Sequence, residues 1–214
     1  DGDIDEDASC NPYRPFGNGS TATRTYATTA YDGGTYTETV TIASWAATSG
    51  VASLQRVLLS SAGSSWTVTE AHACNGGATG MTGYALSDGG LTTISASFSS
   101  ARTDLEDAAT MSPGTRWAYS YDATDAIIGA LWNVAGTMEA IGTESVTVAA
   151  GTFDALKVEN TYTLIDATDS GYDRTSTNTT WWVLGLGAVK AYDVDGAGAV
   201  WEDRQLQSYT GFTP

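Results

Sequence analysis

Basic side chains are scarce in this sequence. The 214 residues include only two Lys, Lys157 and Lys190, and seven Arg, against 25 acidic residues, so the formal net charge is −16. A surface of that sign repels nucleic-acid phosphates and anionic lipid head groups. We therefore expect no nucleic-acid partner. The charge is most simply a means of keeping the protein soluble, although low Lys with high Asp also suits a salty or calcium-containing medium.

Long apolar runs and prolines are also few. No apolar stretch approaches the roughly 20 residues that a helix needs to cross a bilayer, so we expect no transmembrane segment. The 42% apolar content and seven Trp exclude a wholly disordered chain. The start "DGDIDEDASC" is typical of a mature end after removal of a signal peptide. These features predict a secreted protein, extracellular or at the cell surface.

Two cysteines, Cys10 and Cys74, are too far apart in sequence for a zinc ribbon or a redox CxxC pair. An even count in a β-rich chain predicts one disulfide in an oxidising compartment. Such a bond would attach the N-terminal segment to the body of the protein.

Turn signals divide the chain into short strands. The sequence predicts an acidic N-terminal arm over residues 1–19 and a single antiparallel β domain over 20–214. The halves of this domain, 20–100 and 112–214, are expected to be joined by a short helical linker near 103–111, where capping residues precede a proline.

The stretch "ESVTVAAGTFDALKVENTYT", residues 144–163, is the clearest strand signal. Apolar residues alternate with polar ones on both sides of an Ala-Ala-Gly-Thr corner, which predicts two strands with one apolar face each. Gly151 would supply the unusual backbone angle at the corner, and Phe153 is available to fill the bend. Gly185 and Gly187 interrupt a later strand, where glycines usually mark a bulge or bend.

This stretch, the later "WWVLGLGAVKAYDV" and "SPGTRWAYSY" resemble motifs of the DUF3108-like and TapB-like secreted bacterial proteins. The resemblance covers roughly residues 112–209. It implies an all-β fold in which one curved antiparallel sheet forms a partial, half-open barrel like that of lipoprotein carriers. It carries over no catalytic residues. The positions that match as residues of the fold are Gly151, Thr152, Phe153, Gly185, Gly187 and Lys190.

Catalytic motifs are missing. The sole histidine, His72, would share a strand face with Glu70 and Cys74, but a metal or nucleophile site there needs a free thiol, which the disulfide would consume. Carboxylates on strands could pair as in a glycosidase, but no pattern pairs any two of them. These carboxylates are Glu38, Glu139, Glu144, Glu159 and Glu202. We therefore expect that the protein is not an enzyme and binds no organic cofactor.

Calcium is the one metal that the sequence suggests. Aspartates alternate in "DGDIDED", where their oxygens could close on the ion. The segment lacks the Gly and Glu of an EF-hand loop, so a frayed acidic tail is the alternative. The tentative calcium ligands are Asp1, Asp3, Asp5 and Asp7.

Aromatic residues could form a binding surface on the concave face. Trp181 and Trp182 must point to opposite faces of a strand, so one of them is expected on that surface, together with Tyr162. Asn18 and Asn178 fit the glycosylation triplet, a weak signal in a Thr-rich chain.

Two functions follow from a partial barrel. The first is a non-catalytic extracellular subunit that self-associates into a filament or other assembly, through its strand edges and N-terminal arm, with copies of itself as partner. The alternative is a half-barrel carrier or binding module whose concave face holds a peptide, a glycan or an apolar ligand such as a lipid.

Overall fold

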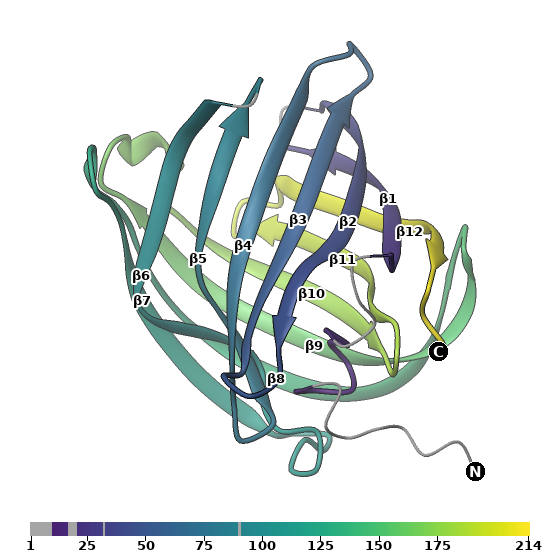
Figure 1. The fold of residues 1–214 in the computed structure, drawn as a ribbon. Helices are drawn as coiled ribbons and strands as arrows, with labels where there is room; N and C mark the ends of the chain where they lie inside the picture. The colour runs from purple at the N-terminus through teal and green to yellow at the C-terminus, as the bar shows by residue number, and fades with distance from the viewer. Residues whose placement is uncertain (1–9, 17–20, 32, 90) are drawn as a thin grey trace.

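The fold is a closed antiparallel β-barrel. The computed structural model describes residues 10–16, 21–31, 33–89 and 91–214 (Figure 1). Its twelve strands are β1 (Thr23–Ala30), β2 (Thr35–Ala46), β3 (Val51–Ser60), β4 (Ser65–Asn75), β5 (Ala78–Asp88), β6 (Leu91–Leu105), β7 (Arg116–Asp125), β8 (Gly129–Val148), β9 (Gly151–Asp166), β10 (Arg174–Val183), β11 (Gly187–Asp195) and β12 (Val200–Thr210).

The expectation of a half-open barrel is wrong. Each strand pairs with its neighbours in sequence, and the first strand pairs with the last through eight register pairs, from Thr23 with Thr210 to Ala30 with Glu202. The all-β antiparallel class is as expected, but the N-terminal half contributes six strands of the same ring. Bulges in most of the ladders increase the twist, and closure removes the unpaired edges that a partial barrel would expose.

Residues 103–111 are not the predicted linker helix. The first three of them end β6, and the buried side chain of Leu105 belongs to the core. Asp107 then begins a single turn, because its carbonyl accepts two backbone N–H groups further along. Too few residues remain before Pro113 for a helix to form. The helical part of the described chain is a 3₁₀ turn, Ser170–Tyr172 (η2), and no helix there is long and apolar enough to cross a membrane.

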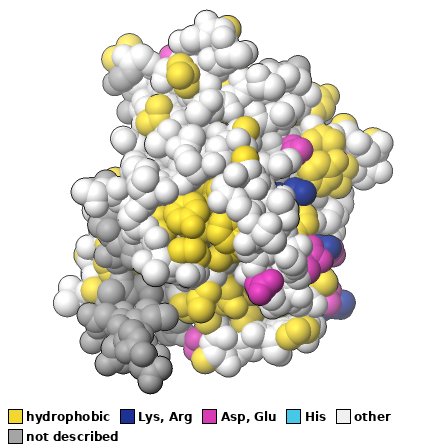
Figure 2. Space-filling model, turned by 90° about the vertical axis from the view of Figure 1, so that its right-hand side faces the viewer, with side chains coloured by type: hydrophobic (Ala, Val, Ile, Leu, Met, Phe, Trp, Pro, Cys, Tyr) yellow, Lys and Arg dark blue, Asp and Glu magenta, His cyan; other side chains and the backbone are white. Residues whose placement is uncertain are grey.

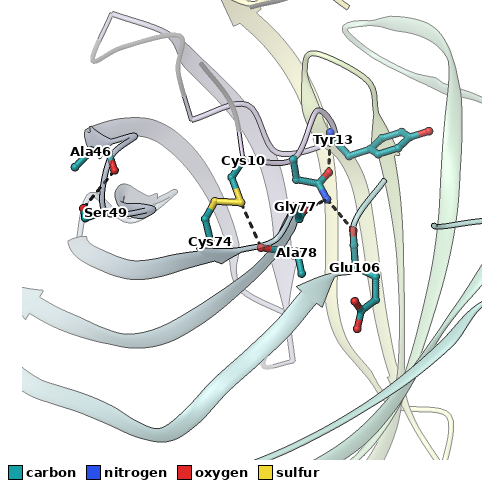
Figure 3. Close-up of a disulfide and its surroundings, with 9 residues drawn as sticks. Cys10, Tyr13, Ala46, Ser49, Cys74, Gly77, Ala78 and Glu106 are labelled. Carbon is teal, nitrogen blue, oxygen red and sulfur yellow. Dashed lines mark hydrogen bonds between the residues drawn. A yellow bond between two sulfur atoms is a disulfide. The ribbon is translucent and has the colours of Figure 1, made fainter. Parts of the chain in front are cut away.

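A segment of the N-terminal arm lies at the lower end of the barrel in the view of Figure 1. The predicted disulfide between Cys10 and Cys74 attaches it to β4 (Figure 3). The Asn11 side-chain amide donates to the Gly77 carbonyl at 2.9 Å, and Phe16 is fully buried in the core. Residues 10–16 are therefore part of the folded body and cover one end of the ring.

The ladder between β6 and β7 is the shortest that the structure describes. It has three register pairs and ends at Phe98. Beyond that point side chains join the two strands. The Asp122 backbone N–H donates to Ser99 Oγ at 2.9 Å, and Trp117 Nε1 donates to the Thr103 carbonyl at 3.1 Å. The wall is continuous there, but it is held by side chains instead of a regular ladder.

Removing the disulfide should destabilise the barrel. The bond closes a loop with a sequence separation of 64 residues, for which the chain-entropy model gives about 4 kcal/mol of stabilisation. We expect the double variant Cys10→Ala, Cys74→Ala to show a free energy of unfolding lower by about that amount, measured by urea denaturation. Equal stability of the variant and the oxidised wild type would show that the other contacts of residues 10–16 suffice.

Candidate functional site: a charged cavity inside the barrel

The interior of the ring holds a cavity of about 460 Å³, within the usual size range of organic ligand sites, roughly 300–1,000 Å³. Inward-facing residues of all sectors of the ring line it. Six of the seven arginines are among them: Arg14, Arg24, Arg56, Arg102, Arg174 and Arg204. The exception is Arg116, which is exposed and paired with Glu139 on the outside. Most of the basic residues of this acidic protein are therefore inside it.

The outer surface is different in character. On the face drawn in Figure 2, charged side chains are few and uncharged atoms cover most of the area. The two lysines lie outside the cavity, within 5.0 to 5.8 Å of the Trp181 ring. The arginines are therefore concentrated in the cavity, and the lysines are not.

Glu38 on β2 is the most enclosed of the interior charges. Its carboxylate accepts hydrogen bonds from Arg56 Nε at 2.6 Å and Arg204 Nη2 at 2.9 Å, and its side chain has no exposed area. Burial alone would raise the pKa of Glu38, but Arg204 and Arg56 outweigh it and lower the pKa to about 2. Glu38 is therefore ionised at neutral pH, and it ties β2 to β3 and β12.

A second group of charges adjoins the first through Arg56. Arg56 Nη1 also contacts Glu70 Oε1 at 2.9 Å, so this one guanidinium bridges two carboxylates. Asp104 is held by Arg102 Nη2 at 2.6 Å and by the guanidinium of Arg14, which reaches in from the N-terminal segment. The arginines lower the pKa of both carboxyls despite burial. Both carboxylates therefore remain charged inside the ring.

His72 is a structural member of this group. Its Nε2 lies 3.0 Å from Glu70 Oε2 and 3.3 Å from Arg14 Nη2. Burial and the positive charge of Arg14 lower the pKa of His72, so the ring is neutral at physiological pH. Cys74, the thiol that a metal or nucleophile site would need, is in the disulfide. Among the described residues, no group of three or more His, Cys, Asp and Glu could hold a metal ion.

Two interior carboxyls behave in the opposite way. Burial raises the pKa of Asp193 and of Glu202. Asp193 accepts a hydrogen bond from the Tyr162 hydroxyl at 2.6 Å. Burial therefore disfavours the charged form of these two carboxyls, whereas arginines favour the charged form of Glu38, Glu70 and Asp104.

The wall formed by β5–β8 carries aromatic rings next to Arg102 and Asp104 of β6. Rings from β5–β8 stack in pairs, Tyr84 with Trp132 and Phe98 with Tyr121, whose centroids are 5.8 and 4.2 Å apart. Trp182 of β10 lines the same space. The lining of the cavity thus combines arginines and carboxylates with stacked rings. Its chemistry suits the binding of an amphipathic molecule.

The turns at the end away from residues 10–16 carry exposed apolar side chains. Ile127, in the turn between β7 and β8, is 94% exposed, and Leu91, at the start of β6, is 76% exposed. The others at this end are Tyr31, Leu59, Ile128, Ile165 and Tyr172. The end of the ring that residues 10–16 leave uncovered therefore has an apolar rim.

Of the predicted concave-face aromatics, Tyr162 and Trp182 line the cavity. Trp181 lies outside it and donates from Nε1 to Glu144 at 2.5 Å. Glu159, like Glu139, forms a surface ion pair, whereas Glu38 and Glu202 face the interior. The tentative calcium ligands Asp1, Asp3, Asp5 and Asp7, like Asn18, lie outside the described residues.

The motif residues occupy turns and the outer surface. Gly151 (φ 143°) begins β9. The Phe153 ring packs over the position that a Cβ on residue 151 would take. Thr152 hydrogen-bonds to Thr147 across the outer face of the β8–β9 hairpin. Gly185 and Gly187, both with positive φ, form the turn into β11, and Lys190 lies over Trp181 on the outside.

Sequence reasoning missed the arginines. A signal was present in the spacing. Arg24 shares a strand face with Tyr26 and Thr28, and Arg56 shares one with Leu54 and Ala52, so each arginine occupies a position of the buried face. Charged residues at such positions are rare unless they are paired. Their partners come from strands that are distant in sequence, which the pattern of one strand does not reveal.

Comparison with solved structures finds the same fold in other proteins. A protein of Parabacteroides distasonis described as a candidate lipoprotein superposes with a TM-score of 0.65 over 94% of this chain and 100% of its own, at 15% identity. A candidate exported protein of Bacteroides fragilis, described as having a YmcC-like fold, gives 0.63 over 90% and 97%, at 14% identity. No protein-family model matches the chain, and no curated protein is significantly similar. At these identities the likeness is one of fold.

Breaking the Arg56 bridge should destabilise the protein. In Arg56→Met, Glu38 and Glu70 each lose one buried counter-charge. Because about a quarter of the Arg56 side chain is exposed, we expect a loss near the lower end of the range for buried pairs, about 3 kcal/mol. Arg116→Met on the outer surface is the matched control and should change stability by about 0.5 kcal/mol or less. Equal urea midpoints for the two variants would contradict the assigned role of Arg56.

Acid should weaken the barrel through Glu38. Because its pKa is about 2 in the folded protein and ordinarily 4.5, its carboxylate stabilises the fold above pH 4.5. That contribution, about 3 kcal/mol, is lost as the pH falls from there through 2. Glu38→Gln lacks this titration, so its free energy of unfolding should fall by less between about pH 6 and about pH 2. Parallel pH profiles of the two proteins would refute the assignment.

Proposed function

We propose that this protein is a secreted, non-catalytic binding barrel that holds an amphipathic organic molecule in its interior. The observation that carries the proposal is the cavity of about 460 Å³, whose lining combines ion-paired arginines with stacked aromatic rings. A folded protein retains buried charges around a cavity at a cost in stability. Ligand binding is a function that would maintain such an interior.

Several observations support a binding role over catalysis. His72 is hydrogen-bonded to Glu70, and both cysteines are in the disulfide. Glu38, Glu70 and Asp104 are held by arginines, which keep their pKa low and make them poor general acids. These groups are arranged to be stable in fixed ionisation states.

Location outside the cytoplasm is part of the proposal. It is supported by the disulfide, and by the descriptions of the two fold neighbours as candidate exported and lipoprotein molecules. Membership of the DUF3108-like family, and calcium binding by the acidic N-terminus, stay predictions.

The alternative of self-assembly has less support. The twelve described strands form a ring, so strand addition would have to break an existing ladder. The acidic residues 1–9 lie outside the described part of the chain.

Filling the cavity should abolish binding while the fold is kept. Thr180 lines the cavity on β10, and its neighbour Thr179 does not. We expect the protein purified from its natural host to carry a non-covalent organic adduct, seen by native mass spectrometry and released on denaturation. Thr180→Trp should lose the adduct and Thr179→Trp should keep it. Wild-type protein with no adduct, or equal occupancy in both variants, would refute the proposal.

A further inference from the structure

Arg24 and Arg174 differ from the other four arginines of the cavity, because neither forms an ion pair in the described chain. Arg174 is half-buried and donates to the Tyr162 hydroxyl at 3.3 Å, whereas Arg24 is buried. Arg14, Arg56, Arg102 and Arg204 each contact a carboxylate. Arg24 forms no ion pair with any residue that the structure describes. Its Nη1 donates to the Leu186 carbonyl at 3.1 Å, its guanidinium lies 5.0 Å from the centre of the Phe212 ring, and its Nε has no hydrogen-bond partner in the described chain.

This guanidinium is buried, with 5% of the residue exposed. Burial lowers the pKa of Arg24, and the nearby positive charges of Arg204 and Arg14 lower it further. Tyr26 and, less strongly, Glu38 raise it, and Glu38 is already hydrogen-bonded to Arg56 and Arg204. A buried cation with cationic neighbours and no counter-ion of its own is costly for a folded protein. A bound anion would remove that cost.

The backbone beside Arg24 makes room for it. Gly187 has a φ of 101°, a conformation that side chains rarely adopt, and a Cβ placed there would lie 2.0 Å from Arg24 Nη1. The turn between β10 and β11 therefore fits an arginine at this place. Gly187 belongs to the sequence motif WWVLGLGAVKAYDV, but the motif alone did not indicate that this glycine makes room for Arg24.

We propose that Arg24 binds the oxyanion head of an amphiphile whose apolar body lies against the aromatic wall. This inference rests on the proposed function and names its ligand class. A guanidinium presents several N–H donors in a plane and pairs with carboxylate, sulfonate or phosphate oxygens. Arg24, the Arg204–Tyr26 contact and Trp182 all border the same cavity, so head and body of one molecule can be held together.

The test compares three probes with the same ten-carbon chain and different heads: decanoate, decanol and decyltrimethylammonium. Each is titrated into delipidated wild-type protein by calorimetry, with inorganic phosphate as a fourth probe. We expect decanoate to bind roughly tenfold or more tightly than decanol, and the cationic probe to bind weakest. Phosphate alone should bind far more weakly than decanoate, because it lacks the apolar body.

Arg24→Met is the test variant and Arg116→Met, the same change on the outer surface, is its control. Arg24→Met should lower the affinity for decanoate roughly tenfold or more and leave that for decanol unchanged. Its Tm without ligand should be equal to or above that of the wild type, because the change removes an unpaired buried charge without stranding a carboxylate. A residue with a purely structural role would give a lower Tm instead. Arg24→Lys keeps a charge and should retain a preference for decanoate over decanol.

The outcomes separate the two levels of the proposal. If decanol binds as tightly as decanoate, or if Arg24→Met keeps full decanoate affinity, a cavity ligand remains supported and the role of Arg24 is refuted. Phosphate binding as tight as decanoate would show an anion site without an apolar subsite, which overturns the amphiphile. If no probe binds and the protein from its natural host carries no adduct, the proposed function fails as well.

Discussion

The ladder between the first strand, β1, and the last, β12, is the constraint on which the interior depends. Eight register pairs close the sheet. The ladder of β12 with β1 and its ladder with β11 each contain a bulge. Because successive residues of a strand point to opposite faces, closure assigns every second residue to an enclosed space. Without it, the arginines of β1, β3 and β12 would face water, and their pairing with carboxylates would matter little.

Closure also explains why the charges are shared between strands. Glu38 joins three strands through two arginines, and Arg56 joins two carboxylates. In a medium of low polarity such contacts are strong, but they only offset the cost of burying the ions. Their main contribution is to geometry: they fix which side chains surround the cavity, and they leave Arg24 without an ion-pair partner in the described chain.

The sequence was sufficient for the class of fold and for several local features. Alternation in residues 144–163 predicted two strands, and both form, as β8 and β9, with a turn at Ala149 and Ala150. The Cys10–Cys74 bond was also predicted correctly. These features depend on neighbouring residues or on a count of two cysteines, which a single sequence contains in full.

The closed ring and its site were not predictable in the same way. Whether a sheet closes depends on the sum of twist and bulges over all its ladders, and only the meeting of Thr23 with Thr210 reveals the result. The ion pairs join residues far apart in sequence, for example Arg204 with Glu38. The expected helix does not form because Leu105 ends β6 and packs in the barrel core. Local capping signals contain no information about such tertiary packing.

The short ladder between β6 and β7 is the part of the barrel wall with the fewest paired residues. Three register pairs hold these strands, whereas β8 and β9 share sixteen. Local opening proceeds most easily where few backbone hydrogen bonds must break together. Amide hydrogens of this stretch should therefore exchange with solvent sooner than those of the β8–β9 hairpin, which is two ladders away in the ring. The line of the wall beside Ser99 and Asp122 is therefore the place where local opening would break the fewest backbone hydrogen bonds, and it lies away from the ladder that closes the ring.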